Sequence, residues 1–139
     1  MKEIKESSFI IKIPKLKKLE YEFNESYGKK GSIKLNIQTE TKILMKKSNA
    51  VVSLELQVFN RSAFDNGEIP FYIQVIMVSD FEWSDDMEEK TVRSLLENNA
   101  PAALLSYMRP YISGITSGSG YPPLVIPLLN FKANEVIYI

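Results

Sequence analysis

Few of the side chains that perform most protein chemistry occur in this sequence. Among its 139 residues there is no cysteine and no histidine. Thiol nucleophiles, Ser-His-Asp triads, structural zinc sites and haem ligation by His or Cys are therefore excluded, as is histidine acid–base catalysis near neutral pH. The absence of cysteine also rules out disulfides and is compatible with a reducing compartment.

Four carboxylates lie close together in the sequence, at Asp80, Glu82, Asp85 and Asp86. A carboxylate pair cleaves glycosides only when it is held at a defined separation, and nothing in the sequence marks a sugar cleft. Acids on successive helix positions also do not converge on one cation. Ser84 or Asp85 is instead expected to cap a helix whose acidic first turns complement the helix dipole. We interpret the cluster as a helix start.

Other motifs give equally weak chemical signals. Gly28–Gly31 is expected to be a turn, and Gly118–Gly120 lacks the strand and helix start that flank a phosphate-binding loop. Tyr107, Arg109 and Tyr111 are compatible with a small polar site, but such residues more often form amphipathic contacts at a helix interface. Since no nucleophile–base pair is present, we expect a protein that is not an enzyme and that uses neither a cofactor nor a metal.

The charges balance overall but are distributed unevenly. Residues 1–47 contain 12 Lys and 6 Glu, and the remainder carries the compensating acidic surplus. The lysines are scattered singly or in pairs, which is typical of solvated strands and turns, so we expect no nucleic-acid partner. The longest apolar stretch, Ile69–Val78, is too short to span a bilayer, and no targeting segment is visible. We therefore expect a cytoplasmic protein without membrane insertion.

Period-two alternation predicts a four-stranded antiparallel sheet within residues 9–83. The expected strands, preceded by a short β-like run over Phe9–Ile13, are Leu19–Phe23, Ser32–Lys46, Ala50–Asn60 and Ile69–Trp83. The last strand is apolar on both faces, so both of its faces must be covered. A four-stranded meander alone leaves one face of the sheet exposed to water. A helix layer together with an oligomer or a client must therefore cover the remaining apolar surface.

Residues 84–117 are expected to be helical and residues 121–139 extended. Pro101 and Pro110 each remove a backbone donor, which predicts two helical pieces: one ends near Asn98 or Asn99 and the other runs from Pro101 toward Ile115. Strands followed by a helix argue an α+β class. We predict one domain over 1–139, a four-stranded antiparallel sheet followed by a long, proline-interrupted helix packed on one face.

Four stretches at fixed spacing in the second half of the chain carry a family resemblance. The fourth strand closes on the pair Phe81 and Trp83, and the helix contains Ala100-Pro101-x-x-Leu104-Leu105-x-Tyr107-x-Arg109. Then follow Gly120-Tyr121-Pro122-Pro123-Leu124 and Pro127-Leu128-Leu129-Asn130-Phe131. Together with the preceding strands these stretches resemble the SecB family of preprotein-export chaperones. The resemblance implies a homotetramer, a dimer of dimers, which holds unfolded clients in apolar grooves without ATP and passes them to the motor SecA.

The resemblance also guides the assignment of sites. The client groove is expected to be lined by Phe81, Trp83, Leu124, Ile126 and Leu128. The oligomer interface is expected at Leu104, Tyr107, Met108 and Tyr111. The SecA-docking face corresponds to Lys18, Glu22, Tyr72 and Gln74. Of these four only Glu22 keeps an acid, and Lys18 would repel a partner built for a negative patch. The family's C-terminal helix and acidic tail are also nearly missing, so a dedicated client such as an antitoxin, or a narrow export set, fits better than full handover to SecA.

Physical reasoning agrees with such a function. A holdase binds unfolded chains by burying apolar side chains, at ~25 cal/mol per Å² before ordering costs. Five Met, seven Phe and seven Tyr supply that surface, and Met adapts to irregular partners. We therefore predict an ATP-independent chaperone for unfolded polypeptides, in protein export or for a dedicated client. The alternative is a small-ligand-binding or regulatory α+β domain with an enclosed cavity and no chaperone activity.

Overall fold

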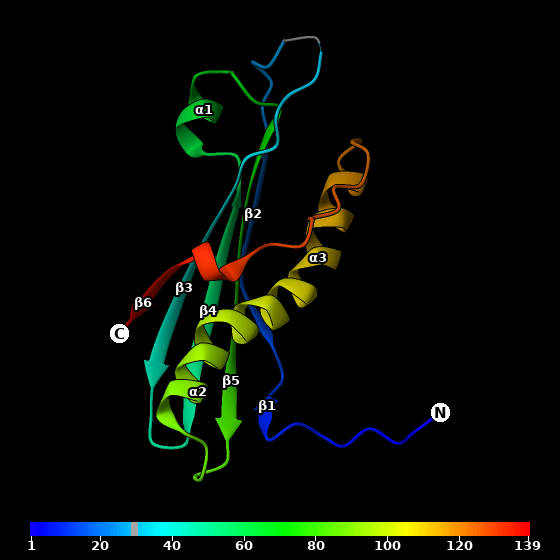
Figure 1. The fold of residues 1–139 in the computed structure, drawn as a ribbon. Coiled ribbons are helices and arrows are strands. Elements are labelled where there is room, and N and C mark those ends of the chain that lie inside the picture. Colours follow the sequence, from blue (N-terminus) through cyan, green and yellow to red (C-terminus); the bar gives the residue numbers. More distant parts are fainter. Residues whose placement is uncertain (29–30) are drawn as a thin grey trace.

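The computed structural model describes residues 1–28 and 31–139, and it shows a long, twisted sheet crossed by a long helix (Figure 1). The strands are β1 (Phe9–Ile11), β2 (Lys15–Phe23), β3 (Ile37–Met45), β4 (Asn49–Val58), β5 (Phe71–Trp83) and β6 (Glu135–Tyr138). The helices are α1 (Arg61–Asp65), α2 (Glu89–Ser94), the π-helical turn η1 (Leu95–Asn99), α3 (Ala100–Gly118) and the 3₁₀ turn η2 (Phe131–Ala133). The predicted α+β class is confirmed. The turn expected at Gly28–Gly31 contains Lys29 and Lys30, which lie outside the described residues.

The order of the strands differs from a meander. The sheet runs β1-β5-β4-β3-β6, and β2 also pairs with β5 instead of with its sequence neighbour β3. Because β5 has 13 residues, one of its edges pairs with β2 over Phe71–Val78 and with β1 over Phe81–Trp83. The expectation of a meander is therefore wrong, and the apolar strand β5 lies inside the sheet, with neighbours along both edges.

The third strand begins later than its alternation predicts. The pattern starts at Ser32, but β3 starts at Ile37. Its partner β4 ends at Val58, because Phe59 adopts a left-handed conformation with φ 64° that a strand does not tolerate. The Phe59 N–H donates to the Asn36 carbonyl at 2.7 Å, and the chain before Asn36 leaves the sheet.

The apolar tail forms a strand that alternation had not predicted. β6 lies parallel to β3, from Glu40 opposite Glu135 to Ile43 opposite Tyr138, at the sheet edge marked in red in Figure 1. Glu135–Tyr138, within the segment expected to be extended, therefore forms a strand. Its partner is a strand edge, which satisfies the backbone polar groups of an otherwise frayed terminus.

One face of the sheet packs against the helices and forms the core. The largest contributors without exposed surface alternate along β4 and recur every fourth residue along α3: Val52, Leu54, Leu56, Val58, Leu104, Met108 and Ile112. On the other face the short helix α1 places the Arg61 guanidinium over the Tyr72 ring, 5.5 Å from its centroid. In the part of the chain that the structure describes, no helix is long and apolar enough to cross a membrane.

The helical region is continuous, in contrast to the two pieces predicted. Pro101 has no N–H to donate to Glu97, and in η1 the Ala100 N–H bonds the Leu95 carbonyl five residues back. Pro110 lies inside α3 without ending it. The helix starts at Glu89 with Glu88 as its N-cap residue, so the expected caps at Ser84 and Asp85 are wrong. Those two residues belong to the preceding turn, where the Asp85 carboxylate accepts a hydrogen bond from Ser48.

A buried amide ties the end of β2 to the segment around α1. The Asn24 side chain donates to the carbonyls of Phe64 at 2.8 Å and Ile69 at 3.0 Å, and it is only 5% exposed. We expect Asn24→Ala to lower the free energy of unfolding by about 2 kcal/mol, because the Ile69 carbonyl loses its side-chain partner, whereas the Phe64 carbonyl keeps the N–H of Gly67. Denaturant unfolding measures this. Asn98→Ala, which removes one exposed bond to Ser94, is the control, and an equal loss in both variants would contradict the assignment.

Tyr138, at the end of β6, makes the free energy of unfolding depend on pH in the alkaline range. Burial, followed by the hydrogen bond to the Glu97 carboxylate, raises the pKa of Tyr138 from 10.0 to about 12. The neutral phenol therefore contributes fully below pH 10, and that contribution is lost as the pH rises through 12. Tyr138 is 38% exposed, so solvent screening reduces the expected contribution to about 1 kcal/mol. In Tyr138→Phe we expect a correspondingly shallower alkaline loss in denaturant titrations, with Tyr111→Phe as control. If the free energy of unfolding of Tyr138→Phe falls with pH as steeply as that of the unsubstituted chain, the linkage is disproved.

Candidate functional site

Three neighbouring depressions surround the end of β5. The first has a volume of about 310 Å³ and lies between β1 and η1, the second of about 280 Å³ lies between β3 and α2, and the third of about 340 Å³ lies beside β1. Met87 lines the first two, Trp83 the last two, and Ser8 the first and third. We call these three depressions together the Trp83–Met87 groove.

Aromatic rings form the floor of the groove. In the β1–β5 register Phe9 lies opposite Trp83 and Ile11 opposite Phe81, which places all four side chains on the helix-covered face. The Phe9 ring stacks on Phe81 with centroids 5.4 Å apart and on Trp83 with centroids 6.4 Å apart. Phe81 is 1% exposed and belongs to the core, whereas Trp83 is half-buried. The Trp83 ring is therefore available to a ligand.

The walls of the groove come from the turn before α2 and from the π-helical turn. Met87 lies between Trp83 and the helix start, and its unbranched thioether side chain adapts to partners of irregular shape. Leu95 and Asn99, at the two ends of η1, face the first depression. The π-helical turn that Pro101 imposes thus brings both residues to the groove. Non-α-helical turns of this kind are frequent at functional sites.

Among the residues that the structure describes, charged side chains line parts of the second and third depressions but not the first. Lys12 pairs with Glu82 at 3.2 Å, and Arg93 pairs with Glu89 at 3.3 Å, all four on the surface. Lys47 and Asp85 line the second depression. Among residues 1–28 and 31–139 no group of three His, Cys, Asp or Glu side chains is arranged to hold a metal ion. An apolar floor with a charged rim suits burial of apolar side chains from an extended partner.

The residues expected to line the client groove separate into two groups. Phe81 and Trp83 lie in the Trp83–Met87 groove, but the other three follow α3 and line none of its depressions. Leu124 is held through its N–H to the Thr116 hydroxyl at 2.9 Å, and Leu128 is 89% exposed. Ile126 is fully buried, so its assignment to an open groove is wrong, because it packs in the core between the extended segment and the rest of the protein.

The residues expected at an oligomer interface also separate. Leu104 and Met108 have no exposed surface, so within one subunit they are core residues and their assignment to an interface is wrong. Tyr107 and Tyr111 are 47% and 41% exposed. They lie three residues after Leu104 and Met108, so at about 100° per residue each is offset by about 60° from the buried residue before it and lies at the margin of the buried row.

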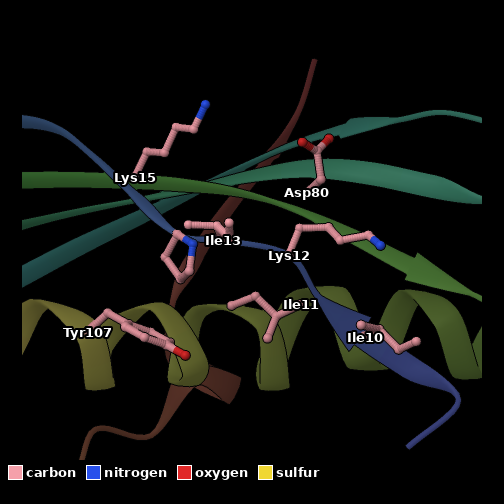
Figure 2. A pocket seen from close by; sticks show the side chains of 8 residues that line it. Ile10, Ile11, Lys12, Ile13, Lys15, Asp80 and Tyr107 are labelled. Carbon is pink, nitrogen blue, oxygen red and sulfur yellow. The ribbon is translucent and has the colours of Figure 1, made fainter.

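A further depression of about 770 Å³ lies where the chain crosses from β1 to β2. It is lined by residues 10–15 with Asp80 and Tyr107 (Figure 2). Figure 2 shows Ile11 above α3 near Tyr107, and Asp80 on the other side of the crossing. Ile13 at its centre is 80% exposed. Exposed Ile13, Tyr107 and Tyr111 give this side of the protein an apolar surface, and the depression shares Ile10 and Ile11 with the Trp83–Met87 groove.

The four positions expected on a docking face lie together on the uncovered side of the sheet. Glu22 is opposite Tyr72, and Gln74 is opposite Glu20 on the β2–β5 ladder, where Lys18 lies one step further along. The sequence reading missed the cation beside them. The Arg61 guanidinium lies 2.6 Å from Glu22 and 3.7 Å from Glu20, in ion pairs that hold the pKa of Arg61 above its usual value. No local signal links α1 to β2, so the sequence alone does not reveal this contact.

Comparisons with known proteins agree with this geometry. The family profile described as SecB, preprotein translocase subunit SecB, matches residues 9–135. An uncharacterized protein of Methanocaldococcus jannaschii is 30% identical over 129 residues, which cover 91% of this chain and 79% of that protein. The protein-export protein SecB of Anaplasma phagocytophilum is 30% identical over 89 residues, 62% of this chain and 55% of that protein, so the chain matches about half the length of that relative.

A solved structure supports the fold. A SecB-like chaperone of Mycobacterium tuberculosis, in complex with a ChAD peptide from an antitoxin, superposes with a TM-score of 0.65 at 14% identity and covers 88% of both chains. The family profile extends over almost the whole sheet, the helices and the start of β6. The chain therefore belongs to the SecB family.

Proposed function

We propose that this protein is an ATP-independent chaperone that holds unfolded or non-native polypeptides in the Trp83–Met87 groove. The observation that carries the proposal is the groove itself. Phe9, Phe81 and Trp83 form an aromatic floor, Met87 and Leu95 form adaptable walls, and no charged side chain of the described residues lines the first depression. Such a surface gains free energy from apolar burial and needs no reactive group. Membership of the SecB family supports a chaperone role.

The client class is proposed from the same surface. The three depressions are each about 280–340 Å³ and neighbour one another through shared lining residues, which suits successive side chains of an extended segment better than one compact ligand. The related mycobacterial chaperone was solved with a peptide from an antitoxin. We propose that this chain likewise serves a dedicated client or a narrow set of exported proteins.

Delivery to SecA fits this surface less well. On the outer face Lys18 pairs with Glu20, and Arg61 pairs with both Glu20 and Glu22. The two cations together balance the two carboxylates. A basic partner that needs a negative patch meets an already paired surface there. We therefore propose that SecA is not the main recipient of the client.

We further propose that the chain assembles through the exposed side of α3, as a tetramer in keeping with its family. Tyr107, Tyr111 and Ile13 expose apolar surface next to the depression at the β1–β2 crossing. Ile13 is 80% exposed and lines the same depression as Tyr107, and contiguous exposed apolar surface of this kind marks an interaction site.

The test combines mass and holding activity on one sample. Light scattering gives the absolute mass of the assembly. Turbidity follows the aggregation of a chemically denatured protein after its dilution into buffer without nucleotide. We expect stoichiometric suppression of turbidity by an assembly of four chains. Undiminished aggregation in the presence of excess protein would overturn the holdase proposal. A monomer that suppresses aggregation would overturn only the tetramer.

A further inference from the structure

The strand β3 offers a longer edge than its neighbour β6 uses. β3 has nine residues, but β6 pairs only with Glu40–Ile43. The other side of β3 pairs with β4 along its whole length, from Ile37 to Met45. In the part of the chain that the structure describes, the backbone at both ends of this edge therefore has no strand partner. An unpaired stretch of strand edge is a template for an added strand.

β6 holds this edge weakly compared with the rest of the sheet. It contributes four residues, all half-buried or exposed, in the only parallel ladder among the described strands. Parallel pairing is slightly less stable per residue than antiparallel pairing. Its remaining anchors are side-chain contacts near the surface, namely Asn134 with Thr39 and Thr41, and Tyr138 with Glu97 and Arg93. Short segments with few buried contacts open at low free energy.

The sequence of β6 shows what kind of segment the edge accepts. Val136 points to the core side opposite Thr41, and Tyr138 lies opposite Ile43 on the same side. Ile137 takes the other face, opposite Lys42. The segment Glu-Val-Ile-Tyr is thus a short, apolar, extended strand of the type that unfolded polypeptides contain in many places.

The same edge leads into the Trp83–Met87 groove. β6 runs parallel to β3, and the N–H of Ile139 donates to the Ile43 carbonyl at 2.9 Å. Two residues further along β3, Met45 lines the second depression together with Trp83 and Met87. A segment that follows the course of β6 and continues past Ile43 along β3 therefore comes beside Met45, at the second depression of the groove.

We propose that the edge of β3 is a second client-binding track, on which an extended apolar client segment pairs in place of β6 and continues into the groove. Backbone hydrogen bonds to β3 supply sequence-tolerant affinity, and the aromatic floor around Trp83 supplies the apolar contacts. A client of nine residues pairs with the whole β3 edge, against four for β6, so it displaces the terminal strand. The inference rests on the proposed function, because it requires that the chain binds clients.

The test locks β6 in place and compares the locked and free forms. The sequence has no cysteine, so Lys42→Cys with Ile137→Cys introduces a single disulfide across the β3–β6 register on the open face. The probe is a fluorescein-labelled, reduced and carboxymethylated protein that stays unfolded in buffer. We expect the oxidised form to bind it at least tenfold more weakly than the dithiothreitol-reduced form, and the reduced form to bind like the unsubstituted chain.

A second lock separates displacement of β6 from general rigidity. Lys42→Cys with Ser53→Cys ties β3 to β4, a ladder that client binding leaves closed. We expect equal binding in its two redox states. Equal affinity of the oxidised and reduced β3–β6 variant would overturn the inference while the holdase proposal stands, and so would an equal loss in both locked variants. Absence of client binding even by the unsubstituted chain would overturn the proposed function and this inference with it.

Discussion

Replacing Trp83 by Ala is expected to weaken the binding of an unfolded client roughly 30-fold, about 2 kcal/mol. Truncation of a central aromatic residue in an apolar interface commonly costs this much. Trp83 is the half-buried ring shared by two of the three depressions, and it stacks on Phe9, so its loss removes both contact area and the support of the floor. Fluorescence anisotropy of a labelled, permanently unfolded protein measures the affinity.

The matched control for Trp83 is an exposed aromatic residue at the other end of β5. Phe23 is 53% exposed and lies opposite Phe71, where β5 begins. Twelve residues of strand, about 40 Å, separate that position from Trp83. We expect Phe23→Ala to bind the client within twofold of the unsubstituted chain, with the fold of both variants checked by circular dichroism. Equal weakening in the two variants would show that binding follows general apolar exposure instead of the groove.

The parts of the fold that were predicted from sequence are those with a local cause. Alternation along β4 and β5 marks the strands, because side chains on successive residues point to opposite faces. The pairing of β2 with β5 instead of β3 is a long-range choice, which no local pattern encodes. β6 illustrates the same limit, since four apolar residues at a terminus do not reveal which edge they join or in which direction.

The candidate site divides in the same way. Phe81 and Trp83 were predicted because they close a clearly alternating strand, and the structure places both in the groove. Phe9 and Met87 were missed as site residues, since one comes from a separate three-residue strand and the other from an irregular turn. Ile126 was assigned to the groove as an apolar residue of the segment that carries the resemblance, and apolar character alone does not separate a buried side chain from an exposed one.

The helix α3 allows a direct test of which side packs on the sheet and which faces outward. Leu104 has no exposed surface, so Leu104→Ala leaves a cavity against the sheet, and we expect a loss of about 3 kcal/mol in the free energy of unfolding. Three residues later, Tyr107 is 47% exposed, and Tyr107→Ala is expected to change the unfolding of the subunit by no more than about 0.5 kcal/mol. Denaturant titrations at equal protein concentration measure both changes.

On assembly the order of the two effects is expected to be reversed: substitution of the exposed tyrosines lowers the mass, and Leu104→Ala does not. If the exposed side of α3 joins the subunits, Tyr107→Ala combined with Tyr111→Ala removes the two rings that protrude from it, and the mass from light scattering falls below that of the unsubstituted assembly. Leu104→Ala keeps both rings and keeps the mass, provided it is measured where the variant is folded. A double tyrosine variant that keeps its full mass would place the interface elsewhere, with the uncovered sheet face as the remaining broad surface. A mass loss in Leu104→Ala alone would show that its buried contacts also shape the interface.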